Sequence, residues 1–138
     1  MFRFISTFAL VFACVGAAGC GNDAPPTTPV TSPVQVSETF TGTLNVNGAV
    51  IHTFNTDAGP AQTQATLTSL SPDSTAVVSL IMGTWNGNNC EVKLVKDDAT
   101  TGSQLIGNAS AVGAFCVRIA DIGHLTAPTD YSITVTHF

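Results

Sequence analysis

Two segments in the second half of the chain decide its fold: Gly83-Thr-Trp-Asn-Gly-Asn-Asn-Cys90 and Gly113-Ala-Phe-Cys-Val-Arg-Ile-Ala-Asp-Ile-Gly123. They hold the single tryptophan and the two cysteines that lie beyond residue 20. The runs 90–95 and 114–119 are rich in β-branched and other apolar residues, which favours strands. Glycine and asparagine, which are turn residues, lie beside these runs. The two segments therefore predict a β domain.

Outward from these segments, short strand-like runs alternate with turn residues. Asn47-Gly48 predicts a two-residue hairpin because both positions tolerate positive φ, and Gly42 predicts a bend or bulge. The expected strands lie at 36–46, 49–56, 63–70, 75–85, 90–96, 104–106, 114–119 and 131–137. With about eight short strands and no convincing helix after the leader, the sequence predicts an all-β fold, an antiparallel β-sandwich.

Residues 1–19 resemble a bacterial lipoprotein signal peptide. Arg3 gives a short basic start, and 5–18 is an apolar run too short for a comfortable membrane span. Small residues then lead into Cys20, where such signals place the cysteine that is lipidated. The resemblance implies a palmitate-bearing chain anchored to a membrane through Cys20, at the outer membrane or cell surface. The alternative is an ordinary secretory leader cut near Ala18, which leaves Cys20 as a free thiol.

Residues 20–35 follow as a linker that holds four of the seven prolines of the chain. A proline- and threonine-rich stretch of this kind is extended, at about 3.1 Å per residue and roughly 45 Å in all. The sequence thus predicts three parts: a signal peptide at 1–19, the lipidated cysteine and tether at 20–35, and a β-sandwich domain at 36–138.

Cysteine usage agrees with export. Cys14 lies in the leader and Cys20 is assigned to the lipid, so Cys90 and Cys116 remain as one even pair in an oxidising compartment. We expect a disulfide between them that ties two strands together. Strict alternation places Cys90 on the face of Leu94 but Cys116 opposite Phe115, so a bulge or a strand end is needed to bring the two cysteines together.

The closing strands resemble those of bacterial pre-peptidase C-terminal (PPC-like) domains, which are secreted, jelly-roll-like β-sandwiches. The matching positions are Gly113, Phe115, Val117, Tyr131, Ile133 and Val135. The resemblance covers roughly 36–138 and implies the fold and a binding or accessory role, with no catalytic residue. The chain departs from that family because no protease precedes the domain and because 90–95 replaces a strand that is usually rich in aspartate.

Charge excludes one class of partner. Only 9% of residues are charged and the net charge is −5, which becomes −6 without Arg3. The three remaining basic residues, Lys93, Lys96 and Arg118, form no cluster in sequence that could neutralise phosphates. We therefore expect no nucleic-acid binding.

No catalytic motif or cofactor site is predicted. The chain has no Gly-x-Ser-x-Gly elbow, and the spacing of His52, His124 and His137 matches no metal-ligand pair. We therefore expect a non-catalytic binding or accessory module with no cofactor, whose partner is a glycan or an envelope protein. The alternatives are a periplasmic chaperone or inhibitor that acts on other proteins, or an envelope enzyme.

Trp85 and its neighbours are the candidate ligand-binding residues. An aromatic ring beside the amides of Asn86, Asn88 and Asn89 suits a sugar-binding surface. A tryptophan close to a bridging cysteine more often packs over the disulfide, and we expect this structural role for Trp85.

Four turn or loop carboxylates are weak candidates for Ca²⁺, because oxygen ligands suit that ion. They are Asp97, Asp98, Asp121 and Asp130. Their spacing fits no EF-hand loop, so we expect solvated turn acids and no metal site.

Overall fold

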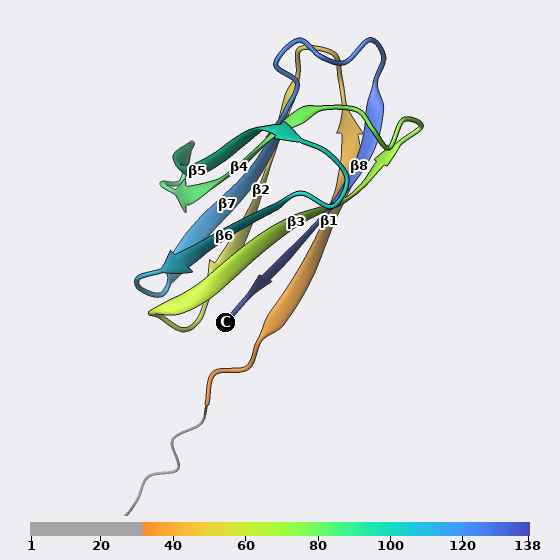
Figure 1. Ribbon diagram of the computed structural model, residues 1–138. Coiled ribbons are helices and arrows are strands. Elements are labelled where there is room, and N and C mark those ends of the chain that lie inside the picture. The colour runs from red at the N-terminus through yellow and green to blue at the C-terminus, as the bar shows by residue number, and fades with distance from the viewer. Residues whose placement is uncertain (1–31) are drawn as a thin grey trace, which may run out of the picture. The chain divides into compact units, whose positions relative to one another are not determined.

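The computed structural model describes residues 32–138, which form two antiparallel sheets stacked as two layers (Figure 1). The eight strands are β1 (Val36–Leu44), β2 (Ala49–Thr56), β3 (Ala61–Ser71), β4 (Val78–Trp85), β5 (Cys90–Ala99), β6 (Gln104–Ala109), β7 (Gly113–Ala120) and β8 (Thr129–His137). The part of the chain that the structure describes has no helix, and so none that could span a membrane. The predicted all-β sandwich is confirmed. The leader, Cys20 and most of the tether lie outside the described residues.

Each sheet has four strands. The order is β1-β8-β3-β6 in the first sheet and β2-β7-β4-β5 in the second. The side chains that alternate inward from both sheets form the core, and the largest fully buried ones include Leu44, Leu67, Leu80, Ile119 and Ile133. Each such side chain contributes about 1.5–3 kcal/mol by leaving water. Burial alternates along β2, with Phe54 and Thr56 buried.

The predicted hairpin at Asn47-Gly48 is wrong. The turn itself forms, because Asn47 has a φ of 55° and the Gly48 N–H donates to the Asn45 carbonyl at 2.8 Å. However, β1 pairs with β8 and β2 pairs with β7, so the turn carries the chain from one sheet to the other. Turn chemistry fixes the local backbone, whereas burial of the two inner faces decides which strands pair.

Gly42 is also not a bulge, because β1 pairs with β8 without a shift in register. A Cβ atom at Gly42 would lie 2.7 Å from Tyr131 Oη, so the glycine makes room for the tyrosine ring. The register shifts occur elsewhere, in β3 between Leu67 and Ser69 and at two places in the β4–β5 pair.

The outer face of the first sheet shows how a domain with few charged residues presents a polar surface to solvent. Hydroxyl side chains of β1 and β8 lie opposite one another there, with Ser37 and Thr136 at 3.0 Å and Thr39 and Thr134 at 3.2 Å between their oxygen atoms. Cross-strand hydroxyl pairs of this kind stabilise a solvated sheet face modestly. Threonine and serine therefore supply the polar surface that lysine and glutamate supply in many domains.

Candidate binding site

The predicted disulfide is present. Cys90, the first residue of β5, is bonded to Cys116 in β7, with 5.7 Å between the Cα atoms. Both strands belong to the second sheet, with β4 between them. The bond therefore crosses over β4 and ties the edge strand β5 to the centre of its sheet.

A bulge reconciles the two cysteines, as the sequence required. In the β4–β5 pair, Met82 lies opposite Leu94 but Gly83 lies opposite Val92, so Lys93 is an extra residue on β5. Leu94 consequently packs against the core, whereas Val92 is 51% exposed on the outer face. The two strands approach closely at this point, because a Cβ atom at Gly83 would lie 1.9 Å from the Glu91 carbonyl oxygen.

The loop after Trp85 is organised by one amide. The Asn86 side-chain oxygen accepts the N–H groups of Asn88 and Asn89 at 3.0 and 2.8 Å, and its side-chain nitrogen donates to Glu91 at 3.1 Å. All three asparagines are exposed, and the side chain of Asn86 is engaged within the protein.

Trp85 ends β4 opposite Cys90 and is half-buried, outside the buried core cluster. This position places Trp85 beside the disulfide, as packing over that bond would require. The structural role of Trp85 stays a prediction.

The four candidate calcium ligands are dispersed over the domain. Asp97 and Asp98 lie near the end of β5 rather than in a turn, Asp121 follows β7, and Asp130 lies in β8. Within residues 32–138, no three acidic, histidine or cysteine side chains form a group that could hold a metal ion. Three of the acids accept from side chains of the protein, since Asp97 accepts from Ser79, Asp98 from Lys96, and Asp130 from Thr43.

Asp121 has a structural use of its own. Its carboxylate accepts the backbone N–H groups of Asn47, Gly123, His124 and Leu125. Burial raises the pKa of this carboxyl, but the four backbone donors outweigh that effect and lower the pKa to about 2. Asp121 thus fixes the loop that follows β7 to the turn between β1 and β2.

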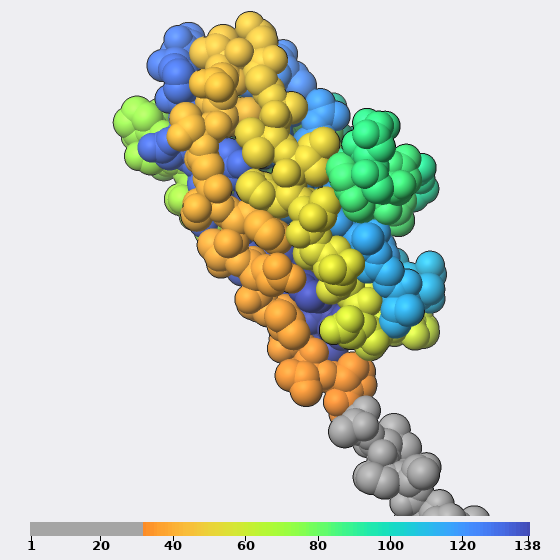
Figure 2. Space-filling view, turned by 180° about the vertical axis from the view of Figure 1, so that it is seen from behind, coloured from red at the N-terminus to blue at the C-terminus, as the bar shows by residue number. Residues whose placement is uncertain are grey.

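Two of the three histidines join elements of the sandwich. The His52 ring stacks on Phe40 with 4.9 Å between ring centroids, and His52 Nε2 lies 2.7 Å from Tyr131 Oη. Burial lowers the pKa of His52 and raises that of Tyr131. His137 Nε2 lies 2.9 Å from a Glu38 carboxylate oxygen. Phe40, His52 and Tyr131 close the side of the sandwich where β1 and β2 meet. On that side, atoms of β1 lie directly against atoms of β2 (Figure 2).

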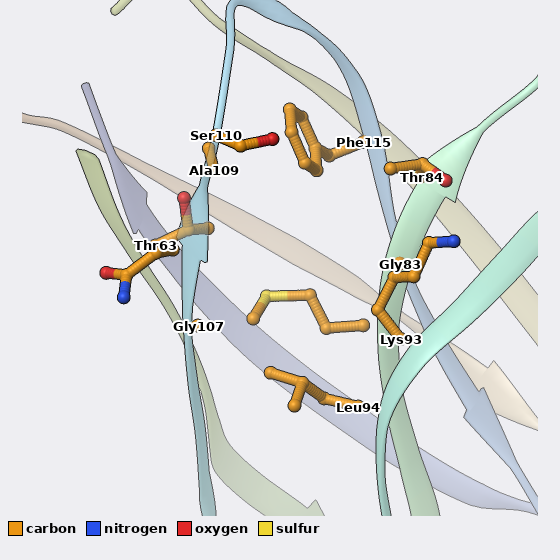
Figure 3. A pocket seen from close by; sticks show the side chains of 11 residues that line it. Thr63, Gly83, Thr84, Lys93, Leu94, Gly107, Ala109, Ser110 and Phe115 are labelled. Carbon is orange, nitrogen blue, oxygen red and sulfur yellow. The ribbon is translucent and has the colours of Figure 1, made fainter. Parts of the chain in front are cut away.

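The opposite side, between β5 and β6, contains a pocket of about 330 Å³ (Figure 3). Its lining includes Thr63, Met82, Lys93, Leu94, Gly107 and Phe115. Thr63 and Gly107, which lie opposite each other in the β3–β6 pair, form one wall, and Lys93 and Leu94 lie on the other (Figure 3).

Sequence reasoning missed this pocket, because its lining comes from five strands that are far apart in the chain. The one local signal is Gly107, since a glycine inside a strand often marks a place where another group approaches closely.

Comparison with known proteins supports the fold. No family model and no curated protein matches the chain. The crystal structure of Yersinia pseudotuberculosis-derived mitogen is similar over 76% of this chain and 88% of that chain, with 19% identity and a TM-score of 0.55.

Two further structures show weaker similarity. PliG of Aeromonas hydrophila, a periplasmic lysozyme inhibitor of g-type lysozyme, matches over 73% of this chain and 84% of its own, with 13% identity and a TM-score of 0.47. Bacillus endospore appendages, which are disulfide-linked pili, match over 75% and 86%, with 13% identity and a TM-score of 0.40. Of these three structures, the mitogen is similar enough to support the architecture, and the likeness shows the fold alone.

Proposed function

We propose that the chain is an exported lipoprotein whose β-sandwich is a non-catalytic module that binds a small ligand between its two sheets. The pocket carries this proposal, because its volume of about 330 Å³ lies within the range of ligand sites. Its lining is mostly apolar, and Lys93 is the titratable side chain among the described residues that form it. Acid–base catalysis requires several convergent titratable groups, so this lining favours binding over chemistry.

Export is supported by the Cys90–Cys116 disulfide, since such bonds persist in oxidising compartments. The leader sequence supports lipidation of Cys20 and a place at the outer membrane or cell surface, and the PPC-like resemblance agrees with a secreted accessory module. Metabolic labelling with palmitate tests the anchor. We expect the wild-type chain to carry the label and to partition into detergent. A Cys20→Ser chain that keeps both properties would contradict it.

A thermal-shift screen of small apolar compounds tests the binding function. A ligand at a hundred times its Kd stabilises the folded state by about 2.7 kcal/mol, which raises the melting temperature by several degrees. A Gly107→Leu variant fills the pocket and should lose the shift. Ile106→Leu, at the exposed neighbouring position, is the matched control. The proposal fails if no compound stabilises the wild type, or if Gly107→Leu responds equally.

A second candidate function is inhibition or chaperoning of an envelope protein. It is favoured by three apolar side chains on the outer face of the second sheet, those of Ile51, Ile81 and Val95. They lie in register on neighbouring strands, with Arg118 between Ile51 and Ile81. Ile51 and Val95 are 40% and 53% exposed. On this alternative, a Val95→Lys variant should lose a partner captured from envelope extract while small-ligand binding is unchanged.

A further inference from the structure

We propose that the pocket between β5 and β6 takes small anionic amphiphiles, with an apolar chain held between the sheets and the anionic head group at Lys93. The proposal rests on the binding function described above and names the ligand class of that same site. It depends on three features of the lining: the apolar side chains that occupy its floor, the single cation beside them, and one enclosed hydroxyl.

The floor suits a flexible apolar chain. Met82, Leu94 and Phe115 supply it, and Figure 3 shows Leu94 across the gap from Gly107. A Cβ atom at Gly107 would lie 2.9 Å from Leu94 Cδ1 and 3.3 Å from Met82 Cε. Both contacts are to the far ends of side chains with several rotatable bonds, and methionine in particular adapts to irregular spaces. The floor can therefore adjust to an alkyl chain without movement of the backbone.

The cation beside the floor selects the head group. Lys93 is the extra residue of the β5 bulge and lines the pocket while remaining exposed to solvent. The ion pairs recorded within residues 32–138 involve Lys96 with Asp98 and His137 with Glu38, so Lys93 is not held in one. Because no carboxylate belongs to the lining, an anionic head group is attracted here and a cationic one is repelled.

Thr63 is the competing polar anchor. Its side chain is buried, with 3% of the residue exposed, and its hydroxyl has no hydrogen-bond partner within residues 32–138. A head group bound there would be deep in the pocket and away from solvent. Desolvation of a charge is costly unless the charge is paired, so a carboxylate is better placed at exposed Lys93 than at the neutral hydroxyl of Thr63. The alkyl chain then lies toward Thr63.

Three probes with the same chain and different head groups test this: octanoate, octan-1-ol and octylammonium. Titration calorimetry is performed on the chain with Cys20→Ser, so that no attached acyl group competes. We expect saturable binding of octanoate at one site per chain, about fivefold weaker binding of octan-1-ol, and no measurable binding of octylammonium. The preference for octanoate should shrink in 1 M NaCl, because salt screens an exposed ion pair.

Variants separate the proposal from its alternatives. Lys93→Met should bring octanoate to the affinity of octan-1-ol, whereas Lys96→Met, on the same strand but outside the lining, should change neither affinity. Thr63→Val should leave octanoate binding as tight or make it tighter. A loss of octanoate binding in Thr63→Val with none in Lys93→Met would place the head group at Thr63 and overturn the assignment. Equal binding of octylammonium would overturn the ligand class. If other compounds in the screen bind in the pocket but octanoate does not, the class is wrong and the binding function stands.

Discussion

The two open sides of the sandwich are filled in opposite ways, although each contains a glycine that faces the interior. Where β1 meets β2, Gly42 lies under the Tyr131 ring, and the tyrosine reaches across to His52 of the other sheet. Where β5 meets β6, Gly107 faces only the mobile ends of Leu94 and Met82, and a pocket remains. The same residue type thus lies against a native ring on one side and against the far ends of two flexible side chains on the other. The difference lies in whether a large side chain with a fixed hydrogen bond stands opposite the glycine.

Removal of the Tyr131 ring should cause the largest loss in the free energy of unfolding. Tyr131 is buried, and Tyr131→Ala should lower the free energy of unfolding by about 3–5 kcal/mol, because it removes an aromatic side chain from a packed interior. Urea denaturation measures the change. Tyr131→Phe removes only the hydrogen bond to His52 and should cost about 1 kcal/mol. Equal losses in the two variants would mean that the hydroxyl, and not the packing of the ring, stabilises this side.

The disulfide should be next in size. It closes a loop with a sequence separation of 26 and should stabilise the domain by roughly 3–4 kcal/mol in the chain-entropy model. A Cys90→Ser, Cys116→Ser double variant should show this loss in denaturant, and hydrogen exchange should locate the added opening in β5. If protection fell equally at β1 and β2, the bond would not be a specific support for the side that holds the pocket.

The two glycines give the most direct comparison of the two sides. Gly42→Ala places a methyl group against a tyrosine hydroxyl that is held by His52, so we expect overpacking that costs about 1–3 kcal/mol. Gly107→Ala meets side-chain ends that can move, and we expect a change below about 1 kcal/mol. Thermal denaturation of both variants measures the difference. A larger loss at Gly107 than at Gly42 would reverse the assignment of the filled and the open side.

Acid should cause the smallest loss in the free energy of unfolding, through His52 on the side where β1 meets β2. Burial lowers the pKa of His52 in the folded state below its ordinary value of about 6.5. The stability that neutral His52 contributes is therefore present above about pH 6.5 and is lost as the pH falls through the folded-state pKa. Urea unfolding at pH 7.5 and 5.5 should show a loss in the wild type that is smaller in His52→Gln. Subtraction of the two removes every pH-dependent contribution that the two proteins share. Identical pH dependence in both proteins would show that His52 is not the group responsible.

The fold could be predicted from the sequence because its signals are local. Alternating apolar residues, turn residues and an even cysteine pair predicted the eight strands and the disulfide, and the mismatch between Cys90 and Cys116 even required the bulge that Lys93 forms. Sheet partners were not predictable in this way. The turn at Asn47-Gly48 has hairpin chemistry, but β1 and β2 bury their inner faces against different neighbours supplied by the C-terminal strands.

The pocket could not be predicted from the sequence for a related reason. Thr63, Met82, Lys93, Gly107 and Phe115 each look ordinary in their own strand, and only the pairing of the sheets brings them together. The Trp85 loop had the strongest local signal, but Asn86 is engaged in shaping its own loop. A composition-based search finds residue types suited to ligands, whereas a pocket depends on how side chains from several strands pack together.

The most direct test of ligand binding between the sheets is an amide chemical-shift titration of the ¹⁵N-labelled Cys20→Ser chain with octanoate. Saturable shifts should cluster at 82–84, 93–94 and 107–110, which line the pocket, and spare 40–42, 52 and 131 on the filled side. Shifts concentrated instead at Ile51, Val92 and Val95 would place binding on the outer face of the second sheet. Such a result, or no saturable shift at all, would contradict a binding site between β5 and β6.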